Sequence, residues 1–208
     1  MNFEQVRPEE IEKRSFAIID AELKQAGITL DARNAPVIMR CIHASADPDY
    51  AKTLAFSEGA VDVMQDLIRK GADIVTDTNM ALAGINRKRL AAFGGEVRCH
   101  MADADVAEKA SERGLTRAAV SMEKAAARGG DIIFAVGNAP TALIALYEMM
   151  QKGLFVPAFV IGVPVGFVNV VQAKELFLHA DVPFIINRGR KGGSSIAAAI
   201  CNAVLYDM

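Results

Sequence analysis

Five short apolar segments, separated by longer helical segments, decide what this chain can fold into. The apolar segments occupy residues 73–77, 96–101, 131–136, 157–162 and 183–187. The stretches between and after them have the spacing of helices, over residues 79–93, 103–127, 140–152, 166–180 and 194–206. Strands that alternate with helices form mostly parallel sheets that are covered on both faces. We therefore predict an α/β fold: a single domain over residues 1–208, with a mostly parallel sheet of about five strands flanked by helices.

Three further helices are expected before the first of these strands. They cover residues 8–26, 34–45 and about 57–70. Pro8 and Pro36 suit the first turns of the first two helices, Gly27 suits a helix end, and Ser57 is expected to open the third. We expect these helices to pack outside the sheet.

The composition excludes several classes of function. Hydrophobic residues make up 52% of the 208 residues, and the net charge is −2, which argues against a protein that coats nucleic acid. The three cysteines are widely spaced and fit buried thiols in a reducing compartment, and no His or Cys set has the spacing of a metal site. No apolar run is long enough to span a membrane, and the first residues do not resemble a signal peptide. We predict a soluble cytoplasmic protein with no membrane partner, no nucleic-acid partner and no bound metal.

In sheets of this kind, ligands bind in the loops that follow the carboxyl ends of the strands. The segment 137–140 leads from a strand into a helix whose N–H groups could bind an anion, although a tight turn explains it equally well. The segment 162–167 is apolar and fits contact with a flat apolar ligand or with a second subunit. Thr116 and Arg117 enter another helix, where an anion site and a plain helix cap are both possible.

The segment 187–195 carries the strongest signal for anion binding. Arg188, Arg190 and Lys191 lie among three glycines at the start of a helix. Glycines let a ligand approach the backbone, and arginine side chains bind carboxylate or phosphate groups. The spacing is not that of a Walker A loop, and the chain contains no G-x-G-x-x-G sequence. A solvated basic loop is the alternative.

Arg40 and His43 are three residues apart in the second predicted helix and therefore share a face. Arg40 interrupts an apolar run, where a charged side chain needs a partner or a cleft. Asp47 could orient the His43 ring if the helix continues that far. Ser15 is a polar residue among apolar neighbours on the first helix. Taken singly, these residues also fit structural roles, as a satisfied serine, a surface arginine and a core histidine.

Six segments of the chain together resemble one known family. They are residues 12–16, 40–44, 77–80, 137–143, 164–168 and 187–194. In this order they are similar to the precorrin-8X methylmutase family of cobalamin biosynthesis, which includes the cobalt-precorrin-8 methylmutases. Each segment alone is a weak signal, but six of them in the family's order, over nearly the whole chain, are specific for this family. The length of the chain also agrees with that of the family.

The resemblance implies an isomerase, a methylmutase that moves a methyl group from carbon 11 to carbon 12 of precorrin-8X or cobalt-precorrin-8. The product would be hydrogenobyrinate or cobyrinate, with no methyl donor consumed and no cofactor required. The resemblance also implies that His43 is the catalytic residue and that Ser15 and Arg40 bind the substrate. It further implies a homodimer with its active sites near the subunit interface.

The implied corrinoid substrate is a flat ring rimmed with carboxylates, so its pocket needs apolar walls and scattered arginines. Arg40, Arg117, Arg188 and Arg190 are the candidates for binding these carboxylates, with Thr116 beside Arg117. His43 would act as a general acid that makes the ring more electrophilic. No residue separates the metal-free substrate from the cobalt-containing one. A non-catalytic corrinoid carrier and an α/β enzyme for a phosphate ligand are the alternatives.

Overall fold

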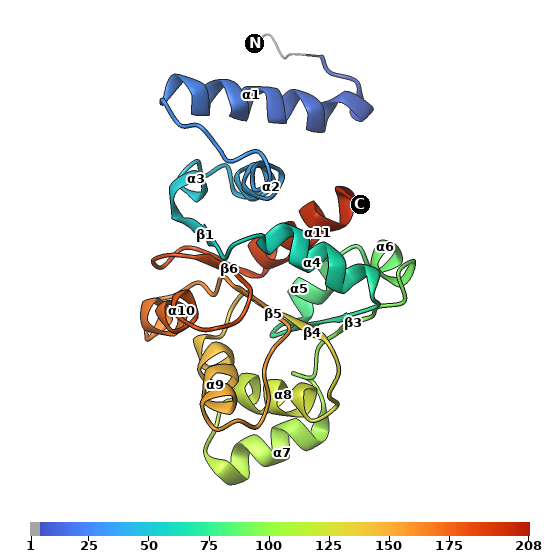
Figure 1. Cartoon of the computed structure of the whole chain (residues 1–208), viewed down its shortest axis with the longest axis vertical. Helices are drawn as coiled ribbons and strands as arrows, with labels where there is room; N and C mark the ends of the chain where they lie inside the picture. The colour runs from blue at the N-terminus through green and yellow to red at the C-terminus, as the bar shows by residue number, and fades with distance from the viewer. Residues whose placement is uncertain (1–4) are drawn as a thin grey trace.

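A six-stranded β-sheet runs through the chain, and helices cover both of its faces (Figure 1). The computed structural model describes residues 5–208. The strands are β1 (Leu54–Phe56), β2 (Asp73–Thr76), β3 (Val97–Arg98), β4 (Ile132–Val136), β5 (Phe159–Gly162) and β6 (Phe184–Asn187). Their order across the sheet is β1-β6-β5-β4-β2-β3. Strands β2 to β6 pair in parallel, and β1 is antiparallel to β6.

The five predicted strands are all present, and β1 adds a sixth that the sequence did not reveal. It has only three residues, all half-buried, which are too few to show an alternating pattern. Leu54 lies opposite Asn187, so the chain enters β1 at the carboxyl edge of the sheet, where β2, β4, β5 and β6 end. The segment before β1 therefore lies beside the loop after β6, and the N–H of Arg188 donates to the carbonyl of Thr53 at 2.8 Å.

The helices form one layer on each face of the sheet. One face carries α2 (Ala35–Ser45), α4 (Ala60–Arg69), α5 (Asn79–Gly84), α6 (Arg87–Ala91) and α11 (Ser194–Tyr206). The other carries α8 (Arg117–Ala126), α9 (Pro140–Gln151) and α10 (Val170–Leu178). Beyond these layers, α1 (Ile11–Gln25) packs on α2, and α7 (Ala104–Arg113) packs on α8, while α3 (Tyr50–Thr53) leads into β1 (Figure 1). No helix in the described part of the chain is both long and apolar enough to cross a bilayer.

Side chains of the central strands alternate between two hydrophobic cores. In β4, Ile133 and Ala135 join the core beneath α2 and α11, whereas Phe134 and Val136 join the core beneath α8 and α9. Every residue of β4 is buried. Continuous burial of this kind is typical of parallel strands covered on both faces, which explains why these segments stand out in the sequence.

Two of the predicted helices are each divided in two. The segment 79–93 forms α5 and α6, because the Asn86 side chain accepts an N–H group of a new helix. The segment 103–127 forms α7 and α8, because Gly114 adopts a φ of +62° at the end of one helix and Thr116 caps the next. Both breaks lie at residues whose side chains or backbone freedom favour helix ends.

The helix expected over 57–70 begins later, at Ala60, and Ser57 does not cap it. The hydroxyl of Ser57 instead accepts the N–H of Phe184 at 2.9 Å and ties this segment to the start of β6. Gly59, with a φ of +62°, precedes the helix.

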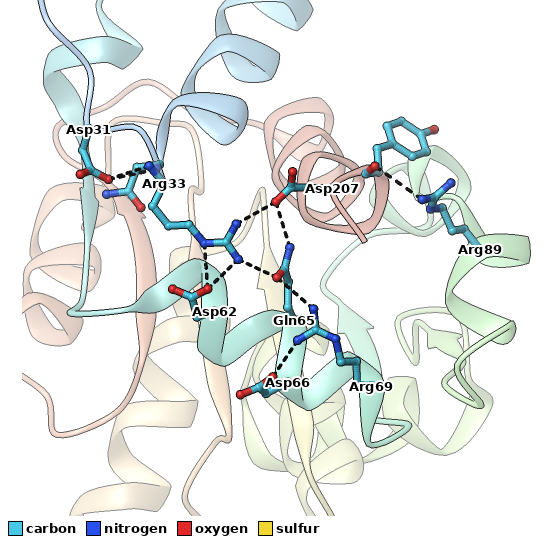
Figure 2. A network of polar contacts seen from close by, with 10 residues as sticks. Asp31, Arg33, Asp62, Gln65, Asp66, Arg69, Arg89 and Asp207 are labelled. Atoms are coloured by element: carbon cyan, nitrogen blue, oxygen red, sulfur yellow. Dashed lines mark hydrogen bonds and ion pairs between the residues drawn. The ribbon is translucent and has the colours of Figure 1, made fainter.

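A polar network fixes the helical layer that contains α2 (Figure 2). Arg33, just before α2, donates to Asp62 and Gln65 of α4 at 2.8 and 2.6 Å. It also donates at 2.9 Å to Asp207, to which the buried Gln65 donates at 3.0 Å. The start of α2, the helix α4 and the end of α11 are therefore joined in one cluster.

Candidate active site

His43 lies on the last turn of α2 and is held by α1. Its Nδ1 atom is 2.8 Å from the hydroxyl oxygen of Ser15, and its ring meets that of Phe16 edge-on with centroids 5.4 Å apart. His43 is exposed, and within residues 5–208 its Nε2 atom has no hydrogen-bond partner. One ring nitrogen is therefore fixed while the other is available to a ligand, which is the arrangement that a general acid or base needs.

Arg40 lies almost one turn before His43 on α2, and some of its N–H groups already bind another residue of the chain. Its guanidinium donates to both carboxylate oxygens of Glu12, at 2.8 and 3.2 Å. It also lies over the rings of Phe16 and Tyr206, 5.3 and 4.9 Å from their centroids. The hydrogen bonds from Arg40 hold the pKa of the Glu12 carboxyl below its usual value. Of the two outcomes expected for Arg40, a partner or a cleft, the structure shows the partner, and three of its five N–H groups make no hydrogen bond within residues 5–208.

Asp47 does not orient His43. The helix α2 ends two residues before Asp47, and Ala46 turns the chain away with a φ of +54°. The carboxylate of Asp47 instead accepts a hydrogen bond from Lys191 at 2.6 Å, as does that of Asp49. The bond from Lys191 lowers the pKa of Asp47. Lys191 is thus neutralised by two acids, and only the two arginines of its loop remain as candidates for anion binding.

Arg188 and Arg190 are exposed, and neither has an acidic partner in the part of the chain that the structure describes. The guanidinium of Arg190 lies over the ring of Phe167, 5.4 Å from its centroid. Packing explains one glycine of this loop, because a Cβ atom at Gly192 would lie 2.0 Å from the carbonyl oxygen of Val163. The loop is therefore pressed against the loop after β5, with both arginines available to an acidic ligand.

The N–H groups just before α9 bind the side chain of Asp77, which comes from the same chain. The carboxylate of Asp77 accepts the N–H groups of Gly137, Asn138 and Ala139 at 2.8, 2.8 and 2.6 Å. Asp77 is completely buried, and burial raises the pKa of its carboxyl although the three donors oppose the shift. The expectation that these N–H groups could bind an external anion is therefore wrong. The sequence placed Asp77 at the end of the predicted strand 73–77 but did not reveal this role, because its partners lie 60 to 62 residues later.

Thr116 and Arg117 lie apart from His43. Thr116 caps α8 by accepting the N–H of Ala119 at 3.2 Å, and its hydroxyl lies 2.7 Å from that of Thr141 on α9. Arg117 is exposed and has no acidic partner among the described residues. Because α8 and α2 cover opposite faces of the sheet, one chain does not bring Thr116 and Arg117 together with the α1–α2 residues.

Large apolar side chains are exposed at the carboxyl edge of the sheet. In the loop after β5, Val165, Phe167 and Val168 are 46%, 83% and 77% exposed. Met80, which follows β2, is 73% exposed. Exposed apolar side chains that gather in one region are typical of binding surfaces. Contact with a flat ligand and contact with a second subunit both remain predictions for this loop.

The cysteines offer no nucleophile next to His43. All three are free thiols, and Cys41 and Cys201 are completely buried. Burial raises the pKa of Cys201 to about 12 and raises that of Cys41 as well, so neither forms a thiolate at neutral pH. Within residues 5–208, no group of His, Cys, Asp and Glu side chains is arranged to hold a metal ion.

Comparison with known proteins places the chain in one family. A family model described as precorrin-8X methylmutase matches residues 10–207. The chain is 40% identical to the cobalt-precorrin-8 methylmutase of Priestia megaterium over 199 residues, which are 96% of this chain and 88% of that protein. It is 42% identical to the precorrin-8X methylmutase of Pseudomonas aeruginosa over 197 residues, 93% of each protein.

A solved structure has the same fold. The structure of precorrin-8X methyl mutase from Thermus thermophilus matches with a TM-score of 0.84 and 40% identity, covering 95% of this chain and 96% of that one. The matched residues include all six segments on which the resemblance depends. These findings favour the methylmutase over the carrier and the phosphate-ligand enzyme. The chain belongs to the precorrin-8X methylmutase family and is an intramolecular methyl transferase.

Proposed function

We propose that this chain moves a methyl group from carbon 11 to carbon 12 of a corrin precursor, with His43 as the general acid. The substrate is precorrin-8X or cobalt-precorrin-8, and the product is hydrogenobyrinate or cobyrinate. The observation that carries the proposal is the Ser15–His43 contact of 2.8 Å, which fixes one ring nitrogen of an exposed histidine and leaves the other without a hydrogen bond to residues 5–208. Relatives with both substrate names match at 40% and 42% identity, so both substrates belong in the assay.

The chemistry assigned to His43 is the delivery of a proton to the substrate. A proton or a strong hydrogen bond from Nε2 draws electrons from the conjugated ring and makes it more electrophilic, which assists the shift of the methyl group. A transferred proton returns to His43 after the shift, because the substrate and the product are isomers. General acid catalysis of this kind contributes about 10²–10⁴-fold to a rate. In a cobalt-containing substrate the metal occupies the ring nitrogens, so the proton has to be received elsewhere on the ring.

We assign substrate carboxylates to Arg117, Arg188 and Arg190, and to the three remaining N–H groups of Arg40. The net charge of the chain is −2, so an acidic substrate is attracted by local arginines rather than by the overall field. The first three arginines have no acidic partner among residues 5–208. The exposed Phe167 beside Arg190 supplies an apolar surface that suits the face of a flat ring.

Replacing Arg188 or Arg190 by alanine should weaken binding of the corrinoid product by about tenfold to a hundredfold, because a charged hydrogen bond in a desolvated site is lost. Arg87→Ala is the matched control, since Arg87 is an exposed arginine on α6 to which we assign no role. Absorbance titration measures the affinity. A product analogue with amidated side chains should bind the variants and the wild type nearly alike, and equal losses for acid and amide would contradict charge pairing.

We also propose a homodimer in which both copies contribute to each site. Two observations support it. The candidate residues lie on opposite faces of one chain, with His43 on the α2 face and Arg117 on the α8 face. The helix α1, which carries Ser15, packs on α2 and leaves Ile11 and Ile18 54% and 42% exposed. A second copy would cover these side chains.

We place the reaction in the cytoplasm. The three cysteines are free thiols, which is typical of proteins that work in a reducing compartment.

Conversion should proceed without S-adenosylmethionine and should survive dialysis of the protein against a chelator. The migrating methyl group comes from the substrate itself, and the chain has no G-x-G-x-x-G loop. Absorbance spectra before and after incubation of each precursor with the dialysed protein measure the conversion. A requirement for the methyl donor, or an activity that returns only with added zinc or iron, would contradict the proposal.

A further inference from the structure

Lys174 on α10 is a buried cation that has no acidic partner in the part of the chain the structure describes. Its side chain is completely buried, and its ammonium donates to the carbonyl oxygens of Gly189 and Lys191 at 2.8 and 2.7 Å. Burial lowers the pKa of Lys174 to about 8, so the charged form is costly in this position. Both acceptors belong to the loop after β6, and they flank Arg190.

This loop is held at three successive carbonyl groups. Between the two carbonyls that bind Lys174, the carbonyl of Arg190 accepts the N–H of Gly166 at 3.2 Å. The carbonyl of Lys191 also accepts from the side-chain amide of Asn187 at 2.8 Å. The backbone on both sides of Arg190 is therefore fixed, while its side chain remains exposed.

We propose that Lys174 is a positioning residue, whose ammonium holds the loop so that Arg188 and Arg190 face the substrate carboxylates. The inference rests on the proposed function. Glycines at 189, 192 and 193 would let an unheld loop adopt many conformations, and ordering it on binding would reduce affinity. Lys174 is buried beneath the loop and does not touch the substrate, so it acts on affinity and not on the methyl shift.

Lys174→Met keeps the length of the side chain and removes its donors. We expect the KM for the corrin precursor to rise roughly three- to tenfold, the size expected when one more flexible side chain must be ordered on binding. The kcat should change by less than about twofold, because the interaction is the same in the ground state and the transition state. Phe177→Leu is the control: Phe177 is buried on the same helix and packs against Tyr147, so its replacement should lower stability without raising KM.

A double-mutant cycle tests whether Lys174 acts through the two arginines. When Arg188 and Arg190 are both replaced by alanine, the further change Lys174→Met should leave KM almost unchanged, since coupled residues are not additive. If the Met variant does not fold, Lys174→Gln enters the same cycle. Its amide keeps one hydrogen-bond donor group, so the rise in KM should be smaller than the roughly three- to tenfold rise expected for Lys174→Met.

The outcomes separate the two proposals. The positioning role of Lys174 is contradicted if the wild type is active and the increases in KM from Lys174→Met and from the two arginine replacements simply add. It is also contradicted if Lys174→Met and Phe177→Leu raise KM equally. A wild type that converts neither corrin precursor contradicts the proposed function itself.

Discussion

Replacing His43 by alanine should lower the turnover of the corrin precursor by about 10²–10⁴-fold, while the affinity for the product stays close to that of the wild type. The loss follows from removal of the proton donor, because His43 is exposed, its Nδ1 atom is held by Ser15, and its Nε2 atom has no hydrogen-bond partner among residues 5–208. Binding should persist, since the arginines and the apolar loop are untouched. Absorbance spectra recorded during the conversion measure the turnover, and titration of the same preparation with product measures the affinity.

Ser15→Ala is the matched variant for this experiment. Ser15 fixes Nδ1 of His43 but does not supply the proton, so its loss should reduce turnover less than the loss of His43. In the double variant, Ser15→Ala should add little, because two residues that act as one unit are not additive. Near-normal turnover of His43→Ala would contradict the assignment of the general acid.

Asp77→Ala should lower the free energy of unfolding by about 1–3 kcal/mol, the cost of leaving a buried hydrogen-bond donor without its acceptor. The change leaves the N–H groups of Gly137, Asn138 and Ala139 without their acceptor, and unpaired buried donors are costly. It also breaks the link between the ends of β2 and β4. Urea unfolding followed by circular dichroism measures the loss.

Asp131→Ala is the control for this stability experiment, since Asp131 is an exposed acid just before β4 and should change the stability by less than about 0.5 kcal/mol. Asp77→Asn should fall between the two, because one oxygen remains as an acceptor. If Asp77→Ala cost as little as Asp131→Ala, water would be satisfying these N–H groups and Asp77 would not hold the turn.

The sequence predicted those parts of the fold that depend on local pattern. The segment 131–136 is apolar at every position but its first, and its five apolar residues are all buried as β4, so their burial could be predicted. The three residues of β1 could not be, because their pairing depends on β6, some 130 residues later. The segment 103–127 is divided at Gly114 and Thr116, a glycine and a capping residue that are typical of a helix break. The helical spacing on both sides of them favoured one continuous helix instead.

The sequence indicated candidate residues for the site, but it did not indicate the contacts among them. Arg40 and His43 share a helix face, which spacing alone shows. The partners of these residues come from α1, where Glu12 binds Arg40 and Ser15 binds His43 across 28 residues. Helix crossing decides such contacts, and the sequence of either helix does not specify the crossing. The same limit applies to Asp77, whose role depends on the neighbouring strand.

The most direct test of the central claim follows one methyl group through the reaction. Precorrin-8X that carries ¹³C in the methyl group at carbon 11 is incubated with the purified chain, with no methyl donor present, and carbon NMR locates the label. We expect the label to appear at carbon 12 of the product without loss. A label that stays at carbon 11 while the substrate remains bound, or that is lost from the product, would contradict it.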